Sequence, residues 1–159
     1  MVGYDVARVC LNGHLINDSV RRNPGRSTQK CVQCGADAIE VCPECNEPLR
    51  GDYHSELVLR AISTYRRATY CGRCGEALPW LSASLKSSRE LLELSGVEES
   101  VVESLMGQLQ HLVADTPQTE VATERWRRFL ARSGDGTAKL LRKVLANIVT
   151  DAVKSDLGL

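Results

Sequence analysis

The chain has 159 residues, of which 25% are charged, 43% are hydrophobic and only 4% are aromatic. This length suits one domain of ordinary size or two small ones, and so few aromatic residues exclude a large aromatic core. The formal net charge is zero, which argues against a strong overall attraction to nucleic acid or to an anionic membrane.

Residues 1–80 read as short strands separated by turns. Strands are predicted at 4–11 and 36–41, and one or two more within 55–70, where β-branched residues and tyrosine gather. Residues 17–30 are polar and turn-rich, so we expect a mobile loop there.

Seven cysteines dominate this half of the chain. Residues 1–14 lack the long apolar run of a secretory signal, and no stretch is apolar enough to cross a bilayer, so we expect a cytoplasmic protein. In that reducing compartment, paired cysteines indicate metal or redox chemistry rather than disulfides.

Six cysteines form three C-x-x-C pairs, and the seventh precedes a histidine by four residues. The predicted ligands are Cys10, His14, Cys31, Cys34, Cys42, Cys45, Cys71 and Cys74. Structural zinc takes four such ligands, so we predict two zinc ions per chain.

The spacing of each C-x-x-C pair predicts a tight turn whose backbone N–H groups point at the thiolates. Gly35, Gly75 and Gly13 stand where a positive φ would close such turns at little cost. A thioredoxin-like redox site is disfavoured, because that motif occurs once and belongs to a βαβ pattern. A disulfide framework is also disfavoured, since seven cysteines would leave one thiol unpaired. An iron–sulfur cluster would use cysteine ligands as well, but the turn context favours zinc. His54 is a competing eighth ligand, but it has no cysteine partner nearby in the sequence.

The four ligand pairs can be combined into two zinc sites in two ways, sequentially or as a cross-brace. The gaps between successive pairs are 16, 7 and 25 residues. A cross-brace, as in RING-type folds, usually has a very short middle gap, whereas seven residues can run as a strand between two separate sites. We therefore predict the sequential arrangement, in which the first two pairs form one site and the last two form the other.

Three segments, VCLNGHLIN, KCVQCGADAIEVCPECNEPLRGDYH and YCGRCGEALPW, resemble a family of uncharacterised bacterial proteins. That family has a double zinc ribbon at its N-terminus and a helical C-terminal half. The resemblance is clear over residues 4–80 and continues beyond them without a motif. It implies zinc binding and a bacterial cytosolic protein, but no activity.

The character of the sequence changes after residue 80, where helical periodicity replaces cysteine and proline. We predict a double zinc-ribbon domain at 1–80 and a bundle of about four helices at 81–159, giving an α+β protein. The helices are expected at 83–95, at about 98–113, from Pro117 to near Gly134 and from Thr137 through Val153. The predicted N-caps are Ser82 or Ser84, Thr116 and Thr137, and Gly96 is expected to end the first helix. The residues expected on the inward faces include Val101, Met106, Val121, Phe129, Val144 and Ala152.

Charge is segregated within the helical half. Residues 86–124 contain eight acidic and two basic side chains, whereas residues 125–143 contain seven basic and one acidic. Complementary charge between neighbouring helices is the simpler interpretation, and a patch for phosphate or an acidic partner is the alternative. The candidate contacts for such a partner are Arg21, Arg22, Arg26, Arg66, Arg67, Arg125, Arg128 and Arg132.

No catalytic motif is recognisable, and the eight ligands leave no thiol and no open coordination position for chemistry. The sequence therefore predicts a non-enzymatic interaction or adaptor protein that binds a protein partner or a second copy of itself. Nucleic-acid binding through the basic loops is the alternative, and a cross-braced RING-like adaptor is a third hypothesis. Neither a membrane nor a small-molecule substrate is expected.

Overall fold

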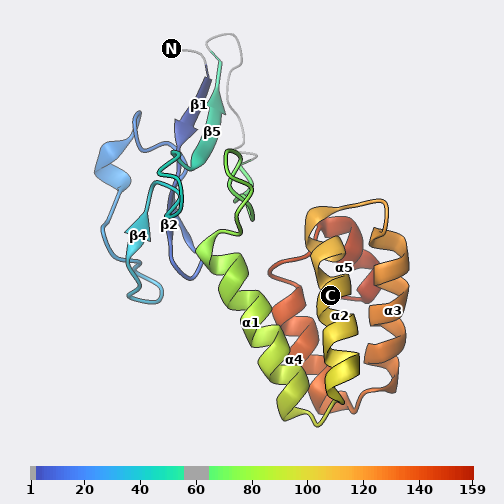
Figure 1. The fold of residues 1–159 in the computed structure, drawn as a ribbon. Coiled ribbons are helices and arrows are strands. Elements are labelled where there is room, and N and C mark those ends of the chain that lie inside the picture. Colours follow the sequence, from blue (N-terminus) through green and yellow to red (C-terminus); the bar gives the residue numbers. More distant parts are fainter. Residues whose placement is uncertain (1–2, 56–64) are drawn as a thin grey trace. The chain divides into compact units, whose positions relative to one another are not determined.

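Five short β-strands precede five α-helices within residues 3–55 and 65–159, which the computed structural model describes (Figure 1). The chain divides into two units, residues 1–82 and residues 83–159. The strands and all seven cysteines belong to the first unit. The predicted fold class, small strands around the cysteines followed by helices and α+β overall, is confirmed.

The strands form two small antiparallel sheets. In the first sheet, β1 (Gly3–Val6) pairs with β5 (Arg50–His54). In the second, β2 (Arg8–Cys10) lies between β3 (Leu15–Asn17) and β4 (Ala38–Ile39). The second sheet delivers Cys10, the last residue of β2, to the interior of the unit, where its side chain is fully buried.

The predicted strands are only partly right. The single strand expected at 4–11 is broken at Ala7, whose N–H bonds to Leu49 O instead of to a sheet neighbour. Only Ala38 and Ile39 of the strand expected at 36–41 are extended partners in a sheet. Residues 56–64 of the expected strands at 55–70 lie outside the described residues, and residues 65–69 form no strand.

The polar segment 17–30 is a loop with one 3-10 turn, η1 (Pro24–Arg26), but it does not reach out freely as expected. The side chain of Asn17 is buried, and its Nδ2 donates to Asn23 O at 2.8 Å and to Ser27 Oγ at 2.9 Å. These bonds fold the loop back on its own start. The segment is therefore tied to β3 instead of reaching out from the first predicted ligand group.

Arg22 joins this loop to both strands of the first sheet. Its Nε lies 2.9 Å from Asp5 Oδ2, and its Nη2 lies 3.3 Å from Asp52 Oδ2. Both carboxylates are buried. Burial raises the pKa of Asp5, but the backbone N–H groups of Arg21 and Val6 and the Arg22 guanidinium outweigh it and hold that pKa below its ordinary value. Asp5 is thus stabilised in its charged form, and Arg22 lies beside both carboxylates.

Replacing Arg22 with methionine is expected to destabilise the first unit by about 3 kcal/mol, because two buried carboxylates would lose their cation. The variant should also regain part of that loss when the pH falls toward 4, since protonation removes the uncompensated charge. Urea unfolding at several pH values measures both effects. The matched control is Arg26→Met, which removes an exposed arginine of the same loop; equal losses in the two variants would refute this role for Arg22.

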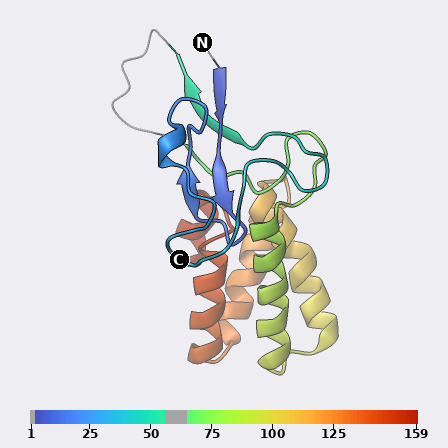
Figure 2. The ribbon, with the colours of Figure 1, turned by 90° about the vertical axis from the view of Figure 1, so that its left-hand side faces the viewer.

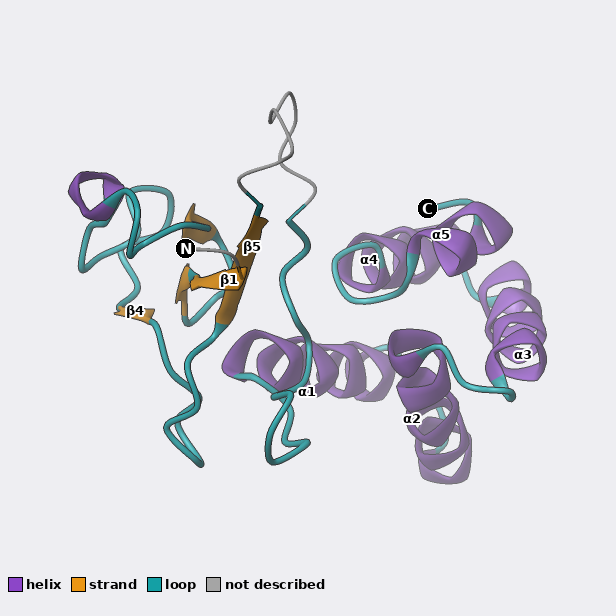
Figure 3. Cartoon of the chain, turned by 90° about the horizontal axis from the view of Figure 1, so that it is seen from above, coloured by secondary structure: helices purple, strands orange, loops and turns teal. Residues whose placement is uncertain are grey.

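The helices are α1 (Pro79–Leu94), α2 (Glu99–Ala114), α3 (Thr119–Arg132), α4 (Asp135–Leu145) and α5 (Asp151–Leu157). They run alongside one another in Figure 2, and the view from above in Figure 3 shows them arranged around a shared interior. Within that arrangement α3 packs against both α2 and α5. None of the helices in the described part of the chain is long and apolar enough to span a membrane.

Several predicted helix ends are wrong. α1 begins at Pro79, so Ser82 and Ser84 lie inside it rather than capping it. α3 begins at Thr119 and not at Pro117, although the hydroxyl of Thr116 accepts the N–H of Gln118 as the predicted cap would, and the hydroxyl of Thr119 accepts the N–H of Thr116. Gly96, with φ of 71°, does end α1 as predicted.

The fourth predicted helix is two helices. Ile148 N bonds to Leu145 O, which tightens the chain after α4, and the extended Thr150 then starts α5. Gly134 rather than Thr137 precedes α4, so Thr137 lies within that helix. The break places Ile148 and Val149 in the buried interior.

The interior of the helical unit is built on Trp126, which is fully buried and donates its Nε1–H to Leu105 O at 3.2 Å. Ala152 and two other residues expected to face inward, Val101 and Val121, are exposed instead. Each lies at the margin of its helix's apolar face, where the periodicity alone did not separate surface from interior. The residues that fill this interior include Leu92, Val102, Leu105, Leu109, Leu112, Trp126, Leu130, Leu141, Leu145 and Val153.

Candidate metal centres

The first group contains Cys10, His14, Cys31 and Cys34, whose ligand atoms all lie within 4.8 Å of one another. A turn after β2 returns His14 to Cys10, and Gly13 N bonds to Cys10 O at 2.7 Å to close it. Cys10 Sγ lies 3.8 Å from Cys34 Sγ and 3.5 Å from His14 Nδ1. The same Nδ1 lies 3.5 Å from Cys31 Sγ, so His14 presents Nδ1 to the group.

The second group contains Cys42, Cys45, Cys71 and Cys74, again with all ligand atoms within 4.8 Å. Cys42 Sγ lies 3.8 Å from Cys74 Sγ, and Cys45 Sγ lies 3.6 Å from Cys71 Sγ. These separations are far longer than the roughly 2.05 Å of a disulfide. The two groups join the first ligand pair to the second and the third to the fourth, which is the sequential arrangement and not a cross-brace.

The three C-x-x-C turns are built alike. In the first of them, Cys31 N bonds to Ala36 O at 2.9 Å and Gly35 N bonds to Cys31 O at 2.8 Å. The equivalent bonds of the other two turns are Cys42 N to Glu47 O, Asn46 N to Cys42 O, Cys71 N to Glu76 O and Gly75 N to Cys71 O. The residue after the second cysteine has a positive φ each time: 73° at Gly35, 58° at Asn46 and 76° at Gly75. Asn46 fills the position because asparagine tolerates this conformation better than other residues with a side chain.

The donor separations match a tetrahedron around zinc. Zinc–sulfur bonds of about 2.3 Å and zinc–nitrogen bonds of about 2.0 Å give sulfur–sulfur edges of about 3.8 Å and sulfur–nitrogen edges of about 3.5 Å. The separations given above, 3.6–3.8 Å between sulfurs and 3.5 Å between sulfur and nitrogen, agree with these edges. Three thiolates with one imidazole, and four thiolates, are both donor sets of structural zinc sites. The residues present therefore fit the metal.

The pKa values of the cysteine thiols favour binding of a cation. The backbone N–H of Ala36 and the side chain of Asn12 lower the pKa of Cys34 to about 6. In the second group, backbone N–H groups of Cys74 and Arg73 lower the pKa of Cys71 to about 6. The N–H of Glu76 acts the same way on Cys74, but burial and the neighbouring cysteines outweigh it and raise that pKa to about 12. The second group thus favours one thiolate but resists a full set until a metal ion neutralises them.

The roles of two residues near the first group, Asn12 and Arg67, were not predicted from the sequence. Asn12 Nδ2 lies 3.4 Å from Cys34 Sγ, so it donates to a ligand sulfur. Arg67, which was expected to contact a partner, is half-buried: its Nη1 donates to Gly13 O and its Cζ lies 5.5 Å from the centre of the Trp80 ring. Burial lowers the pKa of Arg67. No sequence pattern linked these residues, because 54 positions separate Gly13 from Arg67.

Gly13→Ala is expected to destabilise the first unit by about 2 kcal/mol. Gly13 has φ of 87°, and a Cβ there would lie 2.8 Å from the Cβ of Trp80 and closer still to the Arg67 guanidinium. Competition with a chromogenic chelator and thermal unfolding would measure the weakened site. Gly25→Ala is the matched control, since no heavy atom lies within 4 Å of a Cβ at Gly25. Unchanged zinc retention and melting in Gly13→Ala would contradict the expectation.

The remaining sequence candidates lie apart from the metal groups. His54 belongs to neither group, and its Nδ1 lies 3.1 Å from Arg22 Nη1. Arg21, Arg26 and Arg66 are exposed on the first unit. The other three candidates lie together on one face of α3 and line a groove beside α2; they are Arg125, Arg128 and Arg132.

The chain is similar to a family of bacterial proteins rather than to one characterised protein. A family model described as an uncharacterized protein conserved in bacteria, DUF2321, matches residues 3–157. The chain belongs to this family. The match covers both units, so the helical half is as much a part of the family as the half with the metal groups, and the resemblance noted in the sequence is confirmed. No curated protein and no solved structure matches the chain.

Proposed function

We propose that the protein is a non-enzymatic adaptor of the bacterial cytoplasm, in which two zinc ions hold the first unit in shape and the surfaces of the protein bind a protein partner. The observation that carries the proposal is the complete use of the ligands. All seven cysteines and His14 fall into two groups of four, with no thiol left over. A catalytic zinc site keeps one position for water or substrate, whereas four protein ligands close it.

Zinc is favoured over other ions by the chemistry of the donors. Thiolates are soft ligands, which exclude magnesium and calcium in practice. The separations between donors agree with a tetrahedron of zinc's size, as shown above. Zinc has no redox chemistry of its own, so a closed zinc site supplies stability rather than reactivity. The function then lies on surfaces that the two ions hold in place.

Affinity capture of the full chain from its host tests the adaptor proposal. We expect a discrete complex of fixed composition, which is lost when Cys71→Ser and Cys74→Ser remove half of the second site. Arg26→Met is the control, because it changes an exposed side chain of the same unit without touching a ligand. Absence of any discrete complex, with the protein itself or with another, would overturn the proposal.

Nucleic-acid binding is the second candidate, and the row of Arg125, Arg128 and Arg132 on α3 favours it. Titration of labelled single- and double-stranded oligonucleotides at low and high salt tests this candidate. Binding through phosphates weakens steeply as salt rises. We expect the Arg125→Gln, Arg132→Gln variant to lose such binding, and no binding by the wild type at low salt would end this candidate.

A further inference from the structure

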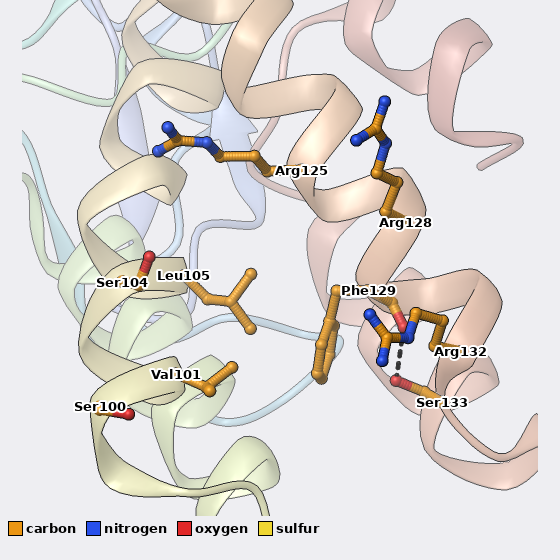
Figure 4. A pocket seen from close by; sticks show the side chains of 9 residues that line it. All are labelled: Ser100, Val101, Ser104, Leu105, Arg125, Arg128, Phe129, Arg132 and Ser133. Carbon is orange, nitrogen blue, oxygen red and sulfur yellow. Dashed lines mark hydrogen bonds between the residues drawn. The ribbon is translucent and has the colours of Figure 1, made fainter.

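A groove of about 610 Å³ runs between the first half of α2 and the second half of α3. Figure 4 shows Val101 and Leu105 of α2 pointing toward Phe129 of α3 across it. Phe129 is half-buried and stands edge-on to Trp126, with ring centres 6.1 Å apart. Val101 is 38% exposed. The groove therefore has an apolar floor that remains open to solvent.

The charged side chains that line this groove are all basic, and they lie along its α3 side. Arg125, Arg128 and Arg132 line it, and among the described residues no carboxylate does. Arg128 pairs with Glu124 at 2.7 Å, but neither Arg125 nor Arg132 has an ion pair within residues 3–55 and 65–159. Residues at i, i+3 and i+7 lie along one side of a helix. The three guanidinium groups thus form a row above an apolar floor, which suits an acidic, apolar helical segment.

The chain itself carries such a segment at residues 90–99, which we call the acidic corner. It consists of the last turn of α1, the turn that follows and the first residue of α2. Leu94 is 85% exposed there, more than any other large hydrophobic residue described in the helical unit. Glu90, Glu93 and Leu94 are spaced at i, i+3 and i+4, so they share one side of α1.

The charge of the acidic corner is only partly balanced within the chain. Arg89 Nη1 lies 3.6 Å from Glu93 Oε1 and 3.3 Å from Glu99 Oε1, and Lys86 Nζ lies 3.9 Å from Glu90 Oε1. The corner contains four glutamates and no basic residue of its own. Its surface is therefore acidic with one exposed leucine, which complements a row of arginines beside an apolar floor.

We infer that the groove between α2 and α3 binds the acidic corner of a second copy of this chain, with Leu94 on the apolar floor and the corner's glutamates facing the arginine row. The inference rests on the proposed function and names one partner for it. The zero net charge supports a second copy over a different acidic protein, because two neutral copies approach without overall repulsion. The contact needs no segment beyond the residues that form the groove and the corner.

Sedimentation velocity of the zinc-loaded full chain, from about 1 μM to about 1 mM, tests the inference. We expect concentration-dependent association that weakens with added salt. The groove variant Arg125→Glu, Arg132→Glu and the corner variant Leu94→Ser, Glu93→Lys should each raise the dissociation constant by at least about a hundredfold, as loss of central contacts does. Leu140→Ser is the matched control, since Leu140 is 54% exposed on α4 and lies in neither surface.

Mixing the two variants supplies the sharpest test. The groove variant keeps an intact acidic corner and the corner variant keeps an intact groove, so the mixture should form mixed complexes although each variant alone does not. Circular dichroism must show wild-type helix content in both variants; if it does not, the single variants Arg132→Gln and Leu94→Ser replace them.

Three results would overturn the inference. They are a wild type that stays monomeric to about 1 mM, association that both variants leave unchanged, and a mixture that fails to associate. A monomeric wild type that still captures a different protein would refute the second copy while leaving the adaptor function standing. Binding of a labelled acidic peptide or an oligonucleotide to the groove of such a monomer would show that the occupant is another molecule.

Discussion

Chelating the metal will unfold the unit at residues 1–82 and leave α2 to α5 helical. Among the described residues of the first unit, few apolar side chains are buried apart from the ligands; they are Val6, Ala7, Val9, Leu49, Leu78, Trp80 and Leu81. Binding of a structural zinc ion contributes about 10–16 kcal/mol of apparent free energy in small zinc domains, more than a core of this size supplies. The strands of this unit are also short, from two to five residues, so their hydrogen bonds cannot replace the metal.

The measurement combines metal analysis with residue-resolved spectra. We expect two zinc ions per chain before treatment, and after treatment the loss of dispersed amide signals from residues 3–55 and 65–78 with the helical signals retained. Chelator already saturated with zinc is the control, because it adds the same molecule without removing metal. Fewer than two ions per chain, or a first unit that keeps its spectrum without metal, would show that the ions do not hold this fold.

The eight ligands could be predicted from the sequence because their geometry is local. The three C-x-x-C pairs of this chain form the same turn, and Gly35 and Gly75 mark its end in two of them. Asn46 ends the middle C-x-x-C turn with φ of 58°, so the same conformation is adopted there by a residue that the glycine pattern did not include. His14 followed from counting, because seven cysteines leave one of eight positions open.

The contacts that position these turns could not be predicted, because they join residues far apart in the chain. Arg22 was taken for a surface contact, yet it lies between the buried Asp5 and Asp52. Arg67 likewise bonds to Gly13 O across the unit. An arginine in a turn-rich stretch looks the same in the sequence whether it faces water or a buried carboxylate, and only the folded chain separates the two cases.

The ends of the helices could be predicted only in part, because they also depend on contacts made in the folded chain. Periodicity located the apolar faces, but α3 begins only at Thr119, although Thr116 accepts the Gln118 N–H with its hydroxyl as a cap would. The break between α4 and α5 contains no glycine or proline that would mark it. It is stabilised by burying Ile148 and Val149, a tertiary effect that overrides local helix preference.

Trp126→Ala is expected to destabilise the helical unit by about 4 kcal/mol, which is a large part of the stability of a domain this small. Trp126 is fully buried in α3, the helix that packs against both α2 and α5. Alanine would leave a cavity where the indole ring stands and would leave Leu105 O without the Nε1–H donor. Urea unfolding followed by circular dichroism would measure the loss.

Trp126→Phe is the matched comparison, because it keeps most of the ring and removes the donor. We expect it to cost about 1–2 kcal/mol, the penalty of a smaller ring and an unsatisfied carbonyl. It also leaves Trp80 as the sole tryptophan, and Trp80 belongs to the first unit. Its fluorescence then reports on the metal-bound unit while circular dichroism reports on the helices. If the two units fold separately, Trp126→Ala will lower the urea concentration at which the helices unfold without changing the zinc content. Loss of zinc at that same urea concentration would show instead that the helices help to hold the metal.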